Sequence, residues 1–191
     1  MVGFFNRLEW IGSEGYNRQM KCLILAAGKG SRLGYKTKPK CMAMVNGKPI
    51  LEHLVNHLNK YGITEIIVNI SAHSDYKKIF KYFGTRLLYL YEPTLLGESG
   101  TEKVLQGWLG DEYIVMNGDT LTNLNLRKLQ KNKTTTYFWN EGRDHYAGTK
   151  YVRKPLSNIW DDSWDGDGAW YFDCGTPQKL AKARKFYAKL R

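Results

Sequence analysis

From Met20 onward, the hydrophobic residues of this chain alternate between strand-like runs and helical spacing. The unbroken apolar run Cys22–Ala27 is typical of a strand buried on both faces of a parallel sheet. The same alternation continues with expected strands at Glu65–Ile70, Arg86–Tyr91 and Tyr113–Met116, and expected helices starting at Pro49, at Asp75–Phe83 and at Thr101–Leu109. This order predicts an α/β fold in which helices cover both faces of a mostly parallel sheet, a three-layer α/β/α arrangement.

The pattern changes after about Thr134. Three strands are expected with no helix between them, followed by a closing helix: Thr134–Trp139, Lys150–Arg153, Ala169–Phe172 and Pro177–Leu190. The stretch Leu156–Gly168 is predicted to be irregular. Residues 1–19 are predicted to form a separate extension, either a short docking helix or a poorly ordered leader, ahead of a single domain at 20–191.

The chain carries a formal net charge of +11, which fits either nucleic acid or small polyanionic substrates as partners. The lysines are scattered, and the basic segment from Lys179 to Arg191 is best interpreted as a solvated helix face. Aromatic-basic motifs of single-strand binders are not evident, so we predict no nucleic-acid partner.

Membrane and secretory segments are not expected, because no run of about 18 apolar residues or signal-peptide pattern occurs. The three cysteines, Cys22, Cys41 and Cys174, form no CxxC pair and no metal-ligand spacing with the histidines. Reduced thiols and a cytoplasmic location are the simplest expectation.

A glycine-rich turn follows the first strand and is the strongest local feature: Ala26-Ala27-Gly28-Lys29-Gly30-Ser31-Arg32. Ligands of open α/β sheets bind at the carboxyl ends of the strands, where such a turn can offer backbone N–H groups to phosphate oxygens. It matches neither the dinucleotide fingerprint nor the P-loop. A basic stretch containing Pro39 and Lys40 comes next and can return a positive charge to the turn.

Two aspartates stand at the ends of predicted strands. Asp119 follows the strand Tyr113–Met116, and Asp173 follows Ala169–Phe172. Each alone could simply cap a turn or a helix. As a pair at one sheet edge they can converge on Mg²⁺, a hard cation that prefers oxygen ligands and binds together with substrate phosphates.

Five segments, in order, resemble the sugar-1-phosphate nucleotidylyltransferases. They are Leu25–Leu33 with Pro39-Lys40 and Gly47–Glu52; Glu92–Gly97; Asn117–Thr120; Val152–Pro155; and Tyr171–Pro177. The resemblance spans about residues 20–190. It implies a Rossmann-like fold of the nucleotide-diphospho-sugar transferase type, and a reaction of a nucleoside triphosphate with a small phosphorylated acceptor that releases pyrophosphate.

The resemblance also implies residue roles. Nucleotide binding falls to Ala26, Ala27, Gly28, Gly30, Ser31, Arg32, Lys40, Glu92, Gly97 and Asp119. Mg²⁺ binding falls to Asp119 and Asp173, and sugar-phosphate binding to Lys154 and Asp173. Arg32, Lys40, Asp119 and Lys154 are the expected catalytic residues. Because the attacking phosphate is already an anion, the reaction needs positioning and electrostatic stabilisation rather than a general base.

The nucleobase and the acceptor are less closely defined. A carboxylate at Glu92 suits the adjacent N–H donors of guanine, so GTP is favoured and CTP is second. Arg153 replaces the glutamate that commonly precedes Lys-Pro in the family, which leaves phosphocholine open as an acceptor. The alternatives are a phosphocholine-type cytidylyltransferase or a non-catalytic nucleotide- or sugar-phosphate-binding module, and a homo-oligomer is possible.

Overall fold

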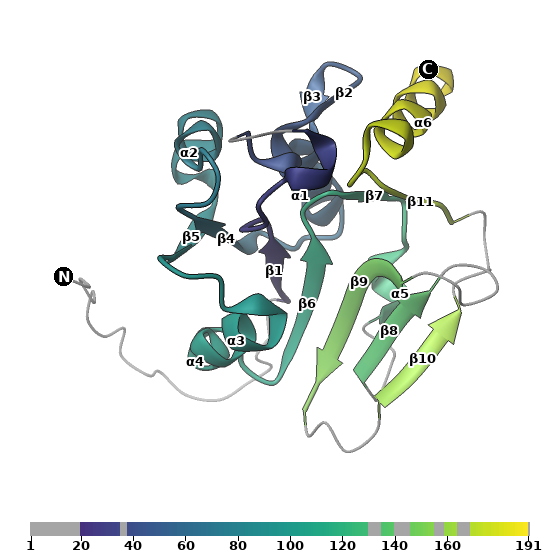
Figure 1. Ribbon diagram of the computed structural model, residues 1–191. Coiled ribbons are helices and arrows are strands. Elements are labelled where there is room, and N and C mark those ends of the chain that lie inside the picture. Colours follow the sequence, from purple (N-terminus) through teal and green to yellow (C-terminus); the bar gives the residue numbers. More distant parts are fainter. Residues whose placement is uncertain are drawn as a thin grey trace.

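The computed structural model describes residues 20–34, 38–129, 135–139, 146–154, 159–163 and 169–190. Within these residues, seven strands form one sheet in the order β10-β8-β9-β6-β1-β4-β5 (Figure 1). Their bounds are β1 Lys21–Leu25, β4 Glu65–Ser71, β5 Leu88–Glu92, β6 Glu112–Asn117, β8 Thr135–Trp139, β9 Tyr146–Arg153 and β10 Ile159–Ser163. Two small antiparallel pairs join β2 Met44–Val45 to β3 Lys48–Pro49, and β7 Thr120–Thr122 to β11 Tyr171–Asp173.

Helices lie on both faces of the sheet. They are α1 Ile50–Lys60, α2 Lys77–Phe83, α3 Gly97–Val104, α4 Gln106–Leu109, α5 Leu126–Leu129 and α6 Pro177–Lys189, with 3-10 turns at Ser31–Leu33, Lys40–Met42 and Gly84–Arg86. Side chains alternate between the faces along each strand. Cys22 and Ile24 therefore pack in one core with α1, α2 and α6, while Leu23 packs in a second core with Leu109 of α4. The predicted three-layer, mostly parallel architecture is confirmed.

Strand direction determines which residues meet at the site. β1 pairs in parallel with β4 and β6, β4 with β5, and β8 with β10, whereas β9 is antiparallel to both β6 and β8. The strands other than β9 therefore share one carboxyl edge, and β9 ends at the opposite edge (Figure 1).

Several boundaries differ from the predictions. The expected helix Thr101–Leu109 begins earlier, at Gly97, and divides into α3 and α4 at Leu105. The predicted irregular stretch Leu156–Gly168 contains β10, a polar strand at the sheet edge. Edge strands commonly carry charged residues, which hides them from a search for apolar alternation.

The predicted extension at 1–19 and the segment 164–168 lie outside the described residues, so the division of the chain at residue 20 stays a prediction. Among the residues described, no helix has the length and apolar character required to span a bilayer.

Candidate active site

The turn after β1 is packed directly against the turn after β6. Leu25 pairs with Asn117 in the sheet, and the Gly118 N–H donates to the Leu25 carbonyl over 2.9 Å. A Cβ atom on Gly118 would lie 2.9 Å from that carbonyl oxygen and 3.2 Å from the Cβ of Ala26. The close approach therefore requires glycine at 118, and it places Asp119 next to the glycine-rich turn.

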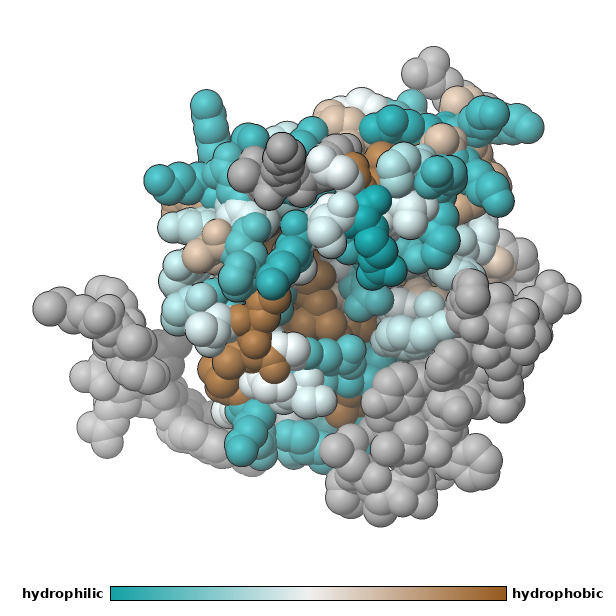
Figure 2. Space-filling model, viewed as in Figure 1, coloured by the Kyte–Doolittle hydropathy of each residue, from teal (hydrophilic) through white to brown (hydrophobic). Residues whose placement is uncertain are grey.

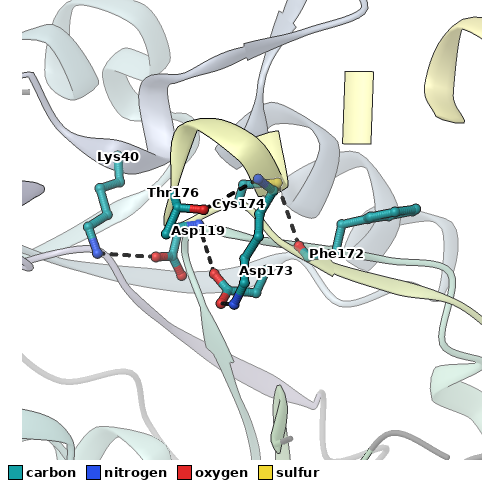
Figure 3. A network of polar contacts seen from close by, with 8 residues as sticks. Lys40, Asp119, Phe172, Asp173, Cys174 and Thr176 are labelled. Atoms are coloured by element: carbon teal, nitrogen blue, oxygen red, sulfur yellow. Dashed lines mark hydrogen bonds and ion pairs between the residues drawn. The ribbon is translucent and has the colours of Figure 1, made fainter. Parts of the chain in front are cut away.

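Asp119 and Asp173 meet although they come from distant segments. β7 pairs with β11 so that Thr120 lies opposite Asp173, and the Cys174 N–H donates to the Asp119 carbonyl over 2.8 Å. A Cβ on Gly175 would lie 2.8 Å from Asp173 Oδ1 and 3.4 Å from Asp119 Oδ2. Asp173 Oδ1 and Asp119 Oδ2 therefore both lie close to Gly175, and their separation is at most the sum of these two distances. Figure 3 shows the Asp119 and Asp173 side chains near each other.

Each carboxylate has a cationic partner. Lys40, from the 3-10 turn Lys40–Met42, places its Nζ 3.4 Å from Asp119 Oδ2, and Figure 3 shows it reaching across to that carboxylate. Lys179, in the first turn of α6, places its Nζ 2.5 Å from Asp173 Oδ2. Positive charge thus surrounds the aspartate pair from two different elements.

The electrostatic surroundings of Asp173 favour its ionised form. Partial burial raises the pKa of this carboxyl, but the Lys179 ammonium, the Gly175 N–H and the charge of Arg32 together hold the pKa below its ordinary value. Asp173 is therefore a carboxylate at neutral pH, the form that a divalent cation binds.

The pair fits a magnesium ion. Two carboxylates supply the hard oxygen ligands that Mg²⁺ prefers. A divalent cation here would complete its coordination with water and substrate phosphates, which is how Mg²⁺ commonly binds. The presence of the ion stays a prediction.

The buried thiols beside this pair are unreactive. Cys41 and Cys174 are both free, and burial together with the negative charge of Asp119 raises the pKa of each to about 12. Both remain protonated at neutral pH, so neither supplies a thiolate nucleophile. Both cysteines act here as small buried side chains of the core.

The start of the glycine-rich turn is hydrogen-bonded to two side chains of β4. The backbone N–H groups of Ala26 and Ala27 donate to Asn69 Oδ1, over 2.5 and 3.1 Å. Ser71 Oγ donates to the Ala27 carbonyl over 2.7 Å. The two alanine N–H groups therefore have partners within the protein, and the nucleotide-binding role of Ala26 and Ala27 stays a prediction.

The remainder of the turn is exposed except at Gly30, which is buried. Gly28, Ser31 and Arg32 are exposed, and a Cβ on Gly28 would meet no atom within 4 Å. Gly30 is in the left-handed conformation, with φ of 72°, where glycine is favoured. These residues stay candidates for phosphate binding, while Ala26 and Ala27 form the supported base of the turn.

Glu92 does not face a ligand as predicted. Its side chain is buried, with 1% exposed, and its Oε1 accepts hydrogen bonds from Asn69 Nδ2 over 3.0 Å and from Thr101 Oγ1 over 2.5 Å. Its Oε2 accepts from the Leu96 N–H over 3.2 Å. The base-reading role for this carboxylate is therefore corrected, because its oxygens are directed to protein donors. Gly97, with φ of 70°, begins α3 directly after this loop.

Lys154 is at the wrong edge of the sheet for its predicted role. Its backbone N–H donates to the Asp111 carbonyl over 2.9 Å, just before β6 begins, whereas Asp119 follows the end of that strand. At about 3.3 Å per residue the two positions are roughly 20 Å apart. The reason is that β9 runs antiparallel to β6. Arg153, at the end of β9, is therefore also distant from the proposed acceptor site, and it forms an ion pair with Glu112 over 3.4 Å.

Three residues of this region were missed from the sequence. Asn69 was detectable as the polar residue inside an Ile- and Val-rich strand, and Gly175 as a glycine between the second aspartate and a helix start. Lys179 was interpreted only as part of a solvated basic helix. A charge pattern alone does not show which lysine turns back toward a carboxylate.

The surface near this region and the comparisons with known proteins complete the description of the site. Figure 2 shows a hollow over the carboxyl ends of β1 and β6, with hydrophobic side chains at its base. The sequence matches the MobA-like NTP transferase domain over residues 22–121, more than half of the chain. The chain belongs to this family.

Two curated relatives carry the same resemblance. The chain is 37% identical over 120 residues to a D-glycero-alpha-D-manno-heptose 1-phosphate guanylyltransferase of Campylobacter jejuni, covering 60% of this chain and 54% of the relative. It is 33% identical over 125 residues to a UTP–glucose-1-phosphate uridylyltransferase of Synechocystis, covering 56% and 32%. The chain thus spans about half the length of the first and a third of the second. The resemblance to sugar-1-phosphate nucleotidylyltransferases is confirmed.

A solved structure gives independent support for the fold. HddC from Yersinia pseudotuberculosis superposes with a TM-score of 0.70 at 20% identity, covering 88% of this chain and 99% of that one. At this identity the likeness supports the architecture alone. The structural likeness covers more of the chain than the family match, which ends at residue 121, and it therefore includes part of the region from β8 to α6.

Proposed function

We propose that this chain transfers a nucleoside monophosphate from a nucleoside triphosphate to a sugar 1-phosphate and releases pyrophosphate, with Mg²⁺ as cofactor. The observation that carries this proposal is the convergence of Asp119 and Asp173 beside the turn after β1, with Lys40 reaching Asp119. Family membership supports the same reaction class. A non-catalytic binding module is disfavoured, because it would have no need for two acids and two cations gathered at one point.

The chemistry is in-line attack by a phosphate oxygen of the acceptor on the α-phosphorus of the nucleotide. Arg32, at the exposed rim of the turn, is placed to hold the leaving pyrophosphate. Lys40 neutralises charge near the reacting phosphorus, and Asp119 and Asp173 hold the cation. Mg²⁺ would act as a Lewis acid that reduces repulsion between the two anions. These residues supply electrostatic stabilisation and positioning, the main contributions in phosphoryl-type transfer.

GTP is the favoured nucleotide and CTP the second. Since Glu92 is buried, this preference no longer rests on its carboxylate. It rests on the guanylyltransferase relative, and the uridylyltransferase relative makes UTP a necessary member of any test. Leu95 and Leu96 are 40% and 41% exposed in the loop before α3, and they offer apolar surface to a base.

Strand direction supports a position for the acceptor. β8 and β10 run parallel to each other and antiparallel to β9, so their carboxyl ends share the edge that holds Asp119. We therefore place the acceptor between this edge and β11, which carries Asp173. A sugar 1-phosphate is the first candidate, and phosphocholine is the alternative that the sequence left open.

The proposal is tested by pyrophosphate release. Each of four nucleoside triphosphates is incubated with a panel of sugar 1-phosphates and phosphocholine, with Mg²⁺ and with EDTA. The expected result is Mg²⁺-dependent turnover with GTP and a sugar 1-phosphate. Turnover with phosphocholine and CTP alone would select the alternative, and no turnover with any pair would overturn the proposal.

A further inference from the structure

One buried side chain connects two segments of the proposed nucleotide site. Asn69, on β4, is 4% exposed. Its Oδ1 accepts from the Ala26 and Ala27 N–H groups, and its Nδ2 donates to Glu92 Oε1. The amide thus joins the base of the glycine-rich turn on one side to the end of β5 on the other. The amide supplies an acceptor on one side and donors on the other, which a carboxylate could not do because it is acceptor-only.

Glu92 extends the connection to the loop before α3. One oxygen accepts from Thr101 Oγ1, on α3, and the other from the Leu96 N–H. Burying a polar group is costly unless it is hydrogen-bonded, so the buried Glu92 side chain depends on these donors staying in place. The loop Pro93–Gly97 is therefore held at a fixed position relative to the turn Gly28–Arg32.

We propose that Asn69 and Glu92 are positioning residues that set the distance between the phosphate side and the base side of the nucleotide site. The inference rests on the proposed function. Because neither side chain reaches the ligand, their effect is the same for every base. Selection among bases then falls to residues exposed in the loop, such as Leu95 and Leu96.

The test uses variants that keep side-chain volume. Glu92→Gln keeps an oxygen for Asn69 and Thr101 but turns an NH₂ group toward the Leu96 N–H. Thr101→Val removes the hydroxyl donor, and Thr101→Ser keeps it. Ile66 is buried in β4, the strand that carries Asn69, and Ile66→Val is the control for a general loss of stability. Binding of GTP, CTP, UTP and ATP without acceptor is measured by calorimetry, beside the melting temperature.

For Glu92→Gln and Thr101→Val we expect affinity to fall by about 3- to 10-fold for every nucleotide that the wild type binds, the scale of one hydrogen bond. The ratio between nucleotides stays within about twofold, since positioning does not distinguish bases. Thr101→Ser and Ile66→Val bind like the wild type, even where the melting temperature falls.

Two results would overturn the inference. A changed ratio between nucleotides in Glu92→Gln would show that this residue reads the base. If nucleotide affinity falls in proportion to the melting temperature in both Ile66→Val and Thr101→Val, the role of Thr101 and Glu92 is structural only. If the wild type binds none of the four nucleotides, the proposed function fails together with the inference, and that outcome is distinct from both.

Discussion

The Nζ atom of Lys179 lies 2.5 Å from Oδ2 of Asp173, one of the two carboxylates proposed to hold Mg²⁺. Their side chains are 45% and 39% exposed, so the ion pair is accessible to water and its own contribution to stability is small. A divalent cation that uses this oxygen has to displace the ammonium. Lys179 is therefore expected to weaken metal binding.

Lys179→Gln should bind Mn²⁺, used as a spectroscopic substitute for Mg²⁺, about 3- to 10-fold more tightly than the wild type, because one nearby positive charge is removed. Electron paramagnetic resonance titration measures the affinity directly. Lys182→Gln, on the same exposed helix, loses the same charge farther from Asp173 and is the control. Equal tightening in both variants would contradict direct competition at Asp173.

Gly175→Ala should weaken metal binding while the fold persists. The new Cβ would stand 2.8 Å from Asp173 Oδ1, so the Asp173 carboxylate would have to shift, while the 3.4 Å to Asp119 Oδ2 is close to an ordinary contact. Gly107→Ala is the matched control, because a Cβ there meets no atom within 4 Å. Mn²⁺ titration and thermal unfolding are measured together. Normal Mn²⁺ affinity in Gly175→Ala would show that the ion does not need both acids.

Lys40→Met should lower kcat by about 10²- to 10³-fold, the usual cost of losing one preorganised charge in the transition state. The Lys40 ammonium is close to the site, at 3.4 Å from Asp119, and only 16% of its side chain is exposed. Lys48→Met, an exposed lysine in β3, should retain the wild-type kcat. A similar small change in both variants would remove Lys40 from the mechanism.

Lys150 should stabilise the second core rather than take part in the reaction. Its Nζ lies 2.6 Å from Glu98 and 2.7 Å from Glu102 of α3, and its side chain is 6% exposed. Lys150→Met leaves two carboxylates without this cation, and we expect it to lower the free energy of unfolding by about 2 kcal/mol at pH 8. Urea denaturation measures the difference, and pyrophosphate release at low temperature should remain near normal.

The effect of Lys150 should depend on pH in one direction. Burial lowers the pKa of this lysine, but hydrogen bonds and charges from Glu102 and Glu98 raise it by more, so the folded pKa is above the ordinary 10.5. Its stabilising contribution is thus complete below pH 10.5 and is lost as the pH rises through the folded pKa. The stability difference between wild type and Lys150→Met should shrink above pH 10.5. A difference that grew there would contradict the assignment.

The parts of the site that could be predicted from sequence are those determined by parallel strands. The sequence shows apolar runs at β1, β4 and β6, which are typical of buried parallel strands. The carboxyl ends of parallel strands lie at the same edge of a sheet. Asp119 and the glycine-rich turn were therefore expected at one edge. The meeting of Asp173 with Asp119 followed from the resemblance and not from the pattern alone. It depends on the β7–β11 pairing, which joins two three-residue strands that leave almost no signal in the sequence.

The errors come from information that local sequence does not contain. Arg153-Lys154 looks like a sugar-phosphate motif, but only the pairing of β9 with β6 reveals that this strand runs backwards and carries Lys154 away. Glu92 ends a strand at the correct edge, yet its side chain turns inward because Asn69 and Thr101 supply donors there. Strand direction and side-chain orientation both depend on distant partners.

The central claim is that Asp119 and Asp173 together hold the divalent cation for nucleotidyl transfer. The most direct measurement is Mg²⁺-dependent pyrophosphate release from GTP and a sugar 1-phosphate by the wild type, Asp119→Asn, Asp173→Asn and the surface control Asp75→Asn. The account predicts a loss on the order of 10³-fold in each of the first two variants and none in the control. Near-normal turnover in Asp119→Asn or Asp173→Asn, with the wild type active, would contradict it.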